Sequence, residues 1–479
     1  MNVLAIDQGT SATKALLVAP GGEVLGHGEV PVRTRSVDGD GVEADPEELF
    51  GSVVAAGEAA LAAAGAPAHA VALANQGETV LAWDPATGTP LTPAIVWQDR
   101  RASVVCDRLA DRADELSAIT GLPLDPYFAA PKMTWLRENM TGDGVVTTTD
   151  TWLLRRLGAG YVTDAATASR TMLLDLGAVE WSEAACAAFG IEAGSLPRVA
   201  DCAGVVGETS AFGRAMPVAG IAVDQQAALL AQRCLAAGDA KCTYGTGAFL
   251  LVTSGSVAAR SGAGLSASVA WRLGGEATYC LDGQVYTAGS ALRWLADLGV
   301  LGSPAELDAV GSAEPDSGGV IFVPALAGLG APYWAPGARG LLSGLTLGTT
   351  RGHLARAVAE GIAATVAELA SAAAADLGRP LASLRVDGGL TASRLLMQAQ
   401  ADLLQVPVLL SRSGAADATA LGVAALARLG TGEAGSVGEA LGPAEVGEVV
   451  EPSISADEAA ERLMIFRSAI SAILALAGP

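Results

Sequence analysis

Two short strand patterns, each ending in a polar turn rich in glycine and threonine, constrain the fold of this chain more than any other feature. The first runs from Val3 to Asp7 and passes through a Gly-Thr-Ser corner into a second strand pattern, Lys14 to Ala19. The same arrangement returns far downstream, where Ala240 to Thr243 leads into Tyr244-Gly245-Thr246-Gly247 and the apolar run Ala248 to Thr253. A repeated unit of this kind predicts two related α/β domains.

The chain is long enough for two large domains, because 479 residues exceed what a single hydrophobic core usually organises. No low-complexity linker separates the two halves. We place the junction near Gln232, since the second hairpin begins soon after it. The sequence therefore predicts an N-terminal domain at residues 1–232 and a C-terminal domain at residues 233–479.

Further elements are predicted around the first hairpin and in the alanine-rich stretches. A third strand, Glu23 to Val30, completes a three-stranded meander, and Asp45 is a typical N-cap for a helix that continues to about Ala64. The stretches Val53 to Ala74 and Ala355 to Ala375 are apolar but interrupted by glutamates, and the first of them also by a proline. We interpret both stretches as alanine-rich core helices rather than membrane spans.

Charge and composition exclude several classes of function. The chain carries 29 basic and 51 acidic residues, and a net charge of -22 would repel nucleic acid and anionic membranes. Its six cysteines form no C-x-x-C pair, which favours buried thiols in a reducing cytoplasm, and the N-terminus lacks a signal-peptide pattern. Only three histidines are present, so acid-base chemistry is expected to fall to carboxylates.

A third glycine corner predicts a nucleotide site. The strand pattern Leu384 to Val386 leads into Asp387-Gly388-Gly389, and a helical pattern follows from Ser393 to Leu404. Backbone amides at such a strand-to-helix turn suit a phosphate or a nucleotide. This corner and the two hairpin turns could converge on one triphosphate.

Two carboxylates stand where phosphoryl transfer would need them, since that reaction requires a metal ligand and an acceptor for the hydroxyl proton. Asp7 ends the first strand, where it could hold Mg²⁺ through water, although a turn that caps its own backbone is an alternative. Asp224 follows the apolar run Ala219 to Val223 and suits a general base, although this position taken by itself favours an ordinary N-cap.

Taken together, nine ordered segments resemble the FGGY carbohydrate kinases, and the glycerol kinases among them most closely. The segments are Asp7–Thr10, Ala94–Gln98, Asp125–Phe128, Asp150–Leu153, Ala168–Leu173, Asp224–Ala228, Tyr244–Gly247, Gly328–Trp334 and Asp387–Gly389. The resemblance implies an actin-like ATPase fold with two ribonuclease-H-like domains and an inter-domain cleft. It also implies an ATP-dependent kinase for a hydroxyl of a small polyol, with glycerol or a similar compound as substrate.

The resemblance further implies roles for individual residues. Asp224 matches the catalytic base, and Asp7 and Asp224 match the positions that hold Mg²⁺. The positions that match ATP contacts are Thr10, Ser11, Lys14, Thr246, Gly289, Gly389 and Ser393. Those that match polyol contacts are Glu78, Trp97, Tyr127, Asp224, Gln225 and Phe249. The domain at 1–232 would then carry the polyol and the catalytic aspartate, the domain at 233–479 would bind the nucleotide, and a homo-oligomer is possible.

The chain departs from the glycerol kinase pattern at three positions. Gly77 stands in Asn75–Thr79 where glycerol kinases have an arginine, Lys14 replaces an arginine near the phosphates, and Ser393 replaces an asparagine. Because the arginine would bind substrate hydroxyls, a kinase for a larger polyol or a ketose such as xylulose is an alternative. A non-catalytic ligand sensor that keeps the cleft is the other alternative.

Overall fold

The N-terminal half of the chain is built around a six-stranded mixed sheet. The computed structural model describes residues 1–38, 40–411, 417–443 and 447–477. The strand order is β14 (Ala203–Thr209), β15 (Met216–Val223), β6 (Ala70–Asn75), β1 (Val3–Gln8), β2 (Ala12–Val18) and β3 (Val24–Pro31). Strands β1, β2 and β3 form an antiparallel meander, and β6 and β15 add parallel strands beside β1. The predicted meander is confirmed.

The C-terminal half repeats this plan in a seven-stranded sheet. The strand order is β18 (Ser266–Leu273), β19 (Glu276–Val285), β17 (Ala248–Gly255), β16 (Ala240–Tyr244), β22 (Leu384–Asp387), β23 (Val408–Leu410) and β24 (Val449–Val450). Strands β16, β17 and β19 are antiparallel neighbours, and β22 and β23 follow β16 in parallel. The duplication predicted from the two hairpins is therefore present in the folded chain.

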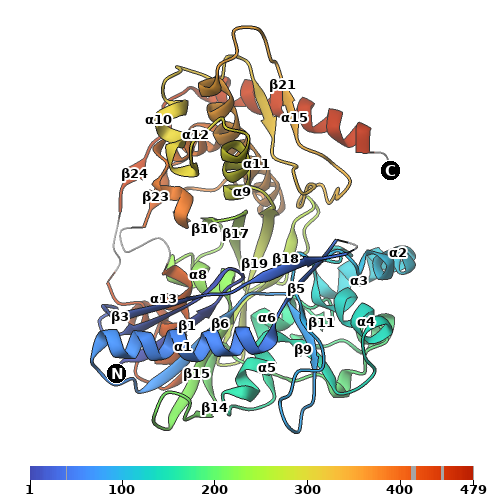
Figure 1. Cartoon of the computed structure of the whole chain (residues 1–479), viewed down its shortest axis with the longest axis vertical. Helices are drawn as coiled ribbons and strands as arrows, with labels where there is room; N and C mark the ends of the chain where they lie inside the picture. Colours follow the sequence, from blue (N-terminus) through green and yellow to red (C-terminus); the bar gives the residue numbers. More distant parts are fainter. Residues whose placement is uncertain (39, 412–416, 444–446, 478–479) are drawn as a thin grey trace.

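Helices cover both faces of the N-terminal sheet, as period-two alternation along β1 requires. Leu4 and Ile6 pack in the same apolar cluster as residues of α1 (Pro46–Ala64), whereas Val3 and Ala5 pack with α13 (Ala418–Gly430). Helix α13 comes late in the chain yet lies in the lower half of the molecule beside β15, β6 and β1 (Figure 1). The chain thus returns from the C-terminal half to complete the N-terminal half.

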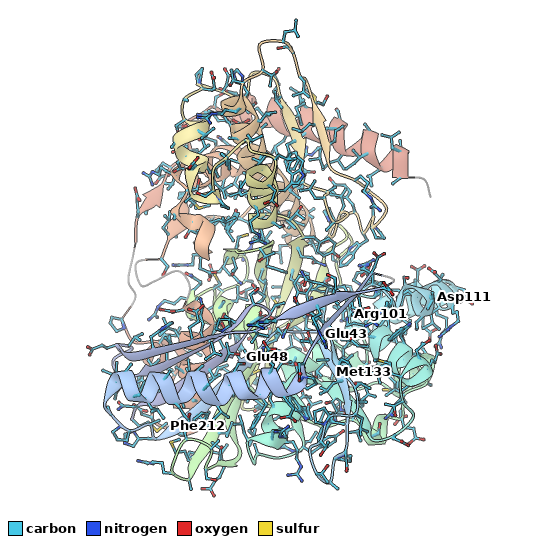
Figure 2. All side chains as sticks on the ribbon, viewed as in Figure 1. Glu43, Glu48, Arg101, Asp111, Met133 and Phe212 are labelled. Atoms are coloured by element: carbon cyan, nitrogen blue, oxygen red, sulfur yellow. The ribbon has the colours of Figure 1, made fainter. Side chains whose placement is uncertain are left out.

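Helix α1 begins as its sequence predicts. The Asp45 carboxylate accepts hydrogen bonds from the backbone N–H groups of Glu47 and Glu48. Farther along the helix, Gly57 leaves room for Phe212, because a Cβ there would lie 2.4 Å from the Phe212 ring; the ring lies beneath α1 in Figure 2. Arg101 and Glu43 also lie side by side in that figure, joined by an ion pair of 2.9 Å.

A five-stranded sheet and several helices complete the N-terminal half. The strands are β4 (Thr34–Val37), β5 (Gly41–Ala44), β8 (Ala94–Ile95), β7 (Val80–Trp83) and β9 (Val145–Thr148). The helices are α2 (Ser103–Arg108), α3 (Ala113–Thr120), α4 (Ala129–Asn139), α5 (Thr149–Arg156), α6 (Ala165–Ser169), α7 (Glu183–Ala188) and α8 (Asp224–Ala231). Short strand pairs also form, β10 (Val162–Asp164) with β13 (Arg198–Ala200) and β11 (Leu174–Asp175) with β12 (Glu180–Trp181).

The C-terminal half has one long buried helix at its centre. Its helices are α9 (Gly289–Asp297), α10 (Leu307–Gly311), α11 (Arg351–Leu377), α12 (Arg394–Leu404), α14 (Val437–Ala440) and α15 (Ala456–Ala477), and its small hairpin joins β20 (Ile321–Val323) to β21 (Leu341–Ser343). Helix α11 has the length and composition to cross a membrane, but 83% of its most apolar window is buried inside the molecule. It is therefore the core helix predicted for residues 355–375.

One sequence prediction about the core is wrong. The stretch Val53 to Ala74 is not all helical, because α1 ends at Ala64 and Ala70–Asn75 forms strand β6. Strand β6 lies between β1 and β15 and is buried on both faces, so its sequence is continuously apolar and lacks the alternation of a half-exposed strand. Such a run cannot be told from a buried helix by periodicity alone. The prediction of six buried free thiols is confirmed.

Candidate active site

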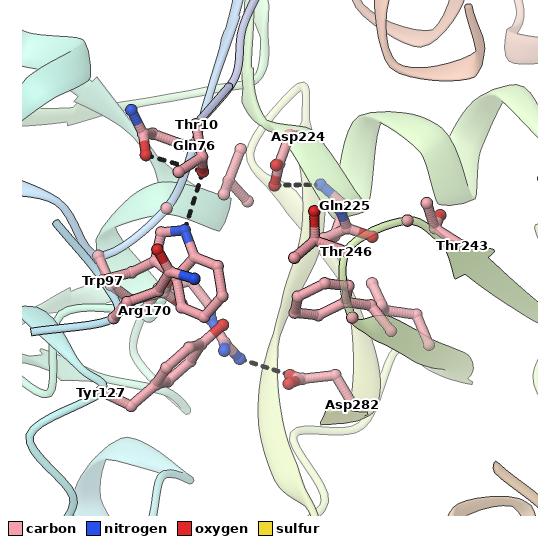
Figure 3. A pocket seen from close by; sticks show the side chains of 18 of the residues that line it. Thr10, Gln76, Trp97, Tyr127, Arg170, Asp224, Gln225, Thr243, Thr246 and Asp282 are labelled. Atoms are coloured by element: carbon pink, nitrogen blue, oxygen red, sulfur yellow. Dashed lines mark hydrogen bonds and ion pairs between the residues drawn. The ribbon is translucent and has the colours of Figure 1, made fainter. Parts of the chain in front are cut away.

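One cavity of about 400 Å³ collects turns from both halves of the molecule. The β1–β2 turn contributes Thr10 and Ser11, and the β16–β17 turn contributes Thr246. Asp224 reaches the same cavity from the junction of β15 and α8 (Figure 3). Two of the three predicted corners therefore meet here.

Asp224 is held in place at the first residue of α8. Its Oδ1 accepts a hydrogen bond of 2.6 Å from the backbone N–H of Gln225, and its carbonyl accepts one of 3.4 Å from the Thr419 hydroxyl on α13. Burial raises the pKa of the Asp224 carboxyl, and the nearby charge of Lys241 acts in the opposite direction. The geometry gives a half-buried carboxylate that lines the cavity and could accept a proton.

Asp7 lies at the end of β1 with one carboxylate oxygen unsatisfied. Its Oδ1 is buried and has no hydrogen-bond partner among the described residues. Burial and the charge of Asp224 raise the pKa of Asp7 to about 7, while Lys14, its register partner on β2, lowers it. A nearby cation would stabilise the charged form of this carboxylate and occupy its unpaired oxygen, so Asp7 fits a magnesium site.

A dedicated metal cage is absent from the described part of the chain, where no three His, Cys, Asp or Glu side chains cluster. Mg²⁺ commonly uses one or two carboxylates and completes its shell with water and substrate phosphate. Asp7 and Asp224 interact electrostatically and supply two such carboxylates. The residues present are thus consistent with Mg²⁺ held together with a nucleotide.

Three aromatic rings form one wall of the cavity. The Trp97 ring meets Tyr127 edge-on, with centroids 5.7 Å apart, and meets Phe249 edge-on at 6.1 Å. Trp97 is fixed by a hydrogen bond of 2.9 Å from its Nε1 to the Thr10 hydroxyl, which in turn donates to Gln76 Oε1 (Figure 3). All three predicted aromatic residues line the cavity, where their faces could cover a short carbon chain.

The loop that carries Tyr127 is held by a buried lysine. Lys132 Nζ donates to the backbone carbonyls of Pro126, Tyr127 and Phe128 at 2.9, 2.5 and 2.7 Å. Burial lowers the pKa of Lys132 to about 7, an effect that the charge of Glu78 opposes. The aromatic wall is therefore anchored from behind as well as through Trp97.

An arginine that received no role from the sequence lies at the centre of the polar wall. Arg170 Nε donates to Glu78 Oε1 at 2.6 Å, and Arg170 Nη1 donates to Asp282 Oδ2 at 2.5 Å. All three side chains are at least 91% buried, and all three line the cavity. Burial raises the pKa of both carboxyls, and Arg170 opposes both shifts.

Sequence reasoning missed this triad for a simple reason. Arg170 was visible within the segment Ala168–Leu173, but nothing in one sequence indicates that Glu78 from the β6–β7 loop and Asp282 from β19 both reach it. The buried run Tyr279–Val285 on β19 contains Asp282 as a charged residue, which is the one local signal that this carboxylate has. The pairing itself depends on how the two halves pack.

Gly77 lies beside the triad. A Cβ at this position would lie 3.0 Å from Val223 Cγ2, so even a methyl group would press on the end of β15. The guanidinium of Arg170 lines the same cavity as Gly77. Because Arg170 lies in the segment Ala168–Leu173 that matches glycerol kinases, and is paired with Glu78 and Asp282, it does not stand in for the arginine missing at position 77.

The remaining predicted nucleotide residues lie outside the lining of this cavity. Gly289 begins α9 and approaches Gly245 so closely that a Cβ would lie 2.6 Å from its carbonyl oxygen. Gly389 begins a turn of 3₁₀ helix after β22. The Ser393 hydroxyl caps α12, accepting from Leu396 N–H and donating to the Asp308 carboxylate. Lys14 lies on β2 next to Asp7.

Matches to family models decide the family of the chain. The N-terminal domain model of the FGGY family of carbohydrate kinases matches residues 2–231, and the C-terminal domain model matches residues 240–430. The chain belongs to this family. The family predicted from the resemblance of nine short segments is confirmed. The predicted class of enzyme, an ATP-dependent carbohydrate kinase, is confirmed with it.

Individual relatives agree with the family assignment. Glycerol kinase from Aromatoleum aromaticum is 45% identical over 448 residues, which cover 90% of each protein. Glycerol kinase from Bordetella parapertussis is 42% identical over 490 residues, which cover 98% of this chain and 96% of the relative. The crystal structure of Plasmodium falciparum glycerol kinase with ADP superposes with a TM-score of 0.90 at 29% identity, covering 99% and 98% of the two chains. The predicted actin-like ATPase fold is confirmed.

Proposed function

We propose that this FGGY kinase phosphorylates glycerol, converting glycerol and ATP to glycerol 3-phosphate and ADP. One observation carries the proposal: a half-buried carboxylate, a paired arginine and an aromatic wall line one small cavity that both halves of the molecule share. The identity of 42–45% to glycerol kinases over most of the chain supports the choice of substrate.

In the proposed complex, the polyol lies between the aromatic wall and the polar wall. Trp97 and Phe249 would cover the carbon chain, because apolar C–H groups of a polyol gain from leaving water. Glu78 and Arg170 would hydrogen-bond hydroxyl groups, one as acceptor and the other as donor. Tyr127 would close the end of the wall, since it lies over the Arg170 guanidinium at 5.7 Å.

The proposed chemical step begins at Asp224. Its carboxylate takes the proton of the attacking hydroxyl while that oxygen forms a bond to the γ-phosphorus of ATP. The bond between this phosphorus and the β,γ-bridging oxygen breaks, and its electron pair leaves with ADP. Proton and charge therefore balance without a covalent enzyme intermediate, and Asp224 returns its proton to water afterwards.

The turns on either side would receive the triphosphate. Thr10, Ser11 and Thr246 line the cavity and offer hydroxyl and backbone donors, while Lys14 adds positive charge near Asp7. Asp7 and Asp224 would hold Mg²⁺, which supplies charge neutralisation at the phosphates when bound. Gly289, Gly389 and Ser393 would take part on the adenosine side once the two halves close, because domain closure is the usual way such clefts exclude water.

Gly77 favours a second candidate, a kinase for a larger polyol or a ketose. The residue stands where an arginine is expected, and solved xylulose kinases such as that from Brucella ovis share this fold with a TM-score of 0.88 at 26% identity. The identity to glycerol kinases is higher, at 42–45% over most of the chain. Glycerol is therefore the first choice.

A coupled ADP-release assay tests the two candidates directly. The purified wild-type chain would be assayed with ATP and Mg²⁺ over glycerol, erythritol, xylitol, ribitol, xylulose and ribulose. We expect kcat/KM to be highest for glycerol, by at least about tenfold over any five-carbon compound. A ketose with the highest kcat/KM would select the second candidate, and no ADP release with any compound would favour the ligand-sensor alternative.

Four further expectations from the sequence stand as part of the proposal. They are a cytoplasmic location, which the six free thiols support, a possible homo-oligomer, the absence of nucleic-acid and membrane partners, and a domain division at residue 232. Size-exclusion chromatography with light scattering would measure the oligomeric state.

A further inference from the structure

Lys241 is a fully buried lysine whose ammonium group contacts the polyol side of the site. It lies on β16, has no exposed surface, and donates hydrogen bonds to Gln225 Oε1 at 2.6 Å and to Thr243 Oγ1 at 2.8 Å. Neither hairpin motif nor the family resemblance drew attention to it. A buried charge of this kind is costly unless its partners are specific, so its position calls for a physical reason.

The sheet register explains how Lys241 reaches this position. Lys241 and Thr243 lie two residues apart on β16 and so share one face of the sheet. Their register partners on the neighbouring parallel strand are Arg385 and Asp387. The Asp387 carboxyl is hydrogen-bonded by Thr243 and, at 3.1 Å, by Gln232 Nε2. Lys241 therefore lies in a continuous row of polar groups that begins at the third glycine corner.

The other end of this row is Gln225, which lies half-buried at the start of α8 and lines the cavity. An ammonium group has three donors and no acceptor, so only the carbonyl oxygen of the Gln225 amide can face Lys241. The NH₂ group of Gln225 has two donors; one is hydrogen-bonded to the Asp224 carboxyl, so the other is the donor that is left for the cavity.

We propose that Lys241 is a positioning residue that fixes the Gln225 amide as a hydrogen-bond donor to a substrate hydroxyl oxygen. The inference rests on the proposed polyol kinase function. Two consecutive residues at the start of α8 then have opposite roles, because Asp224 accepts from a hydroxyl while Gln225 donates to one. Without Lys241, the Gln225 amide could rotate by about 180° and point its oxygen into the cavity. That oxygen would then compete with Asp224 as an acceptor for hydroxyl protons.

This arrangement also selects the chemistry of the ligand at this point. An N–H donor held in one orientation can hydrogen-bond only to a group with a lone pair, such as a hydroxyl, carbonyl or phosphate oxygen. Sites that bind a hydroxyl through fixed polar partners discriminate strongly against analogues that lack it. Lys241 thus contributes to specificity without touching the substrate.

The sharpest test replaces Gln225 by glutamate. Gln225→Glu keeps the shape and forms an ion pair with Lys241, so it should fold, but it has no N–H to offer the cavity. Polyol binding without nucleotide would be measured by isothermal titration calorimetry, because eight tryptophans contribute to the fluorescence of the chain. We expect Kd for glycerol to rise by about 10- to 100-fold, as it does in Gln225→Ala. Wild-type affinity in Gln225→Glu would overturn the proposal.

A second set of variants addresses Lys241 itself. Lys241→Met removes every donor, and we expect KM for the polyol to rise about tenfold or more while KM for ATP stays within about twofold. Lys241→Arg keeps a donor-only group and should restore part of the loss. In a Gln225→Ala background, Lys241→Met should add little, because both changes remove the same interaction. Multiplying effects, or a rise in the ATP KM alone, would show that Lys241 acts on Asp387 and the nucleotide corner instead.

These measurements separate the inference from the proposed function. If the wild-type protein binds no polyol, the proposed function fails and the variants have no baseline. If the wild-type protein binds glycerol and Gln225→Glu binds it equally well, only the role of Lys241 fails.

Discussion

The two ends of the cleft differ in how much of each is already assembled. At the polyol end, nearly every polar group has a protein partner: Arg170 joins Glu78 to Asp282, and Trp97 is tied to Thr10. At the nucleotide end, the contributions come from backbone turns, and Gly289 and Gly389 lie outside the cavity lining. A small neutral ligand needs a preformed site, because it brings little binding energy to organise one. A triphosphate brings enough charge to draw its turns together.

Breaking the triad at the polyol end should produce the largest effect on the folded protein. Arg170→Met leaves the Glu78 and Asp282 carboxylates buried without their partner, and removing one member of a buried ionic group typically costs about 3–5 kcal/mol. We expect a loss of this size in the free energy of unfolding measured in urea, together with a fall of about 100-fold or more in kcat/KM for the polyol.

A matched control separates burial from the mere loss of an arginine. Arg108 forms an ion pair of 2.7 Å with Glu138, but both side chains are about half exposed. Arg108→Met should leave stability and activity almost unchanged, because exposed pairs contribute little. If Arg170→Met is no less stable than Arg108→Met, the triad does not organise the polyol end.

Asp7 at the nucleotide end should make the free energy of unfolding depend on pH. Its folded-state pKa of about 7 lies above its ordinary value of 3.8, so folding favours the protonated form. The stability that Asp7 contributes is then fully present below pH 4 and is lost as pH rises to about 7. The expected slope is about 1.4 kcal/mol per pH unit within this window for the ligand-free protein.

Urea unfolding of the wild type and of Asp7→Asn between pH 4 and pH 8, in the presence of a chelator, would measure this effect. Other groups also titrate in this pH range, such as Asp164, whose pKa is raised by burial to about 6. Their effect cancels when the free energy of unfolding of one protein is subtracted from that of the other. Asp7→Asn should be more stable than the wild type at pH 8. A pH-independent difference would contradict the account of Asp7 as a carboxyl awaiting a cation.

The smallest of these effects is expected at Gly77, and it would sharpen the description of the polyol end. Gly77→Arg should add a long charged side chain to the lining of the cavity and raise the preference for glycerol over four- and five-carbon substrates by about tenfold in kcat/KM. Gly77→Ala is the control, because its methyl group meets Val223 Cγ2 without adding charge. Equal changes for every substrate would mean that this position does not sense substrate size.

The parts of the site that could be predicted are those that adjoin a local signal. Asp7 and Asp224 each stand at the end of an apolar strand pattern. The two hairpins are predicted by their strand patterns and by the glycine-threonine turns between them. These features depend on neighbours in the sequence. They could therefore be assigned before any tertiary contact was known.

The parts that escaped prediction depend on packing between distant segments. Asp282 and Lys241 lie on buried strands where a polar residue gives no indication of its partner, and α13 returns to the N-terminal sheet from the far end of the chain. Strand β6 was mistaken for helix because burial on both faces removes the alternation that identifies a strand. The surroundings of Gly77 also depend on packing, because its neighbour Val223 comes from β15, far along the chain.

The rate of phosphoryl transfer in Asp224→Asn tests the central claim most directly. The change removes the proton acceptor but keeps the size and the position of the side chain, and Asp45→Asn, at the N-cap of α1, is the control. With ATP, Mg²⁺ and glycerol at saturation, rapid-quench measurement should show a fall of about 10²- to 10⁴-fold in Asp224→Asn, while the dissociation constants of glycerol and of metal-free nucleotide change little. Transfer at close to the wild-type rate would contradict the assignment of Asp224 as the base.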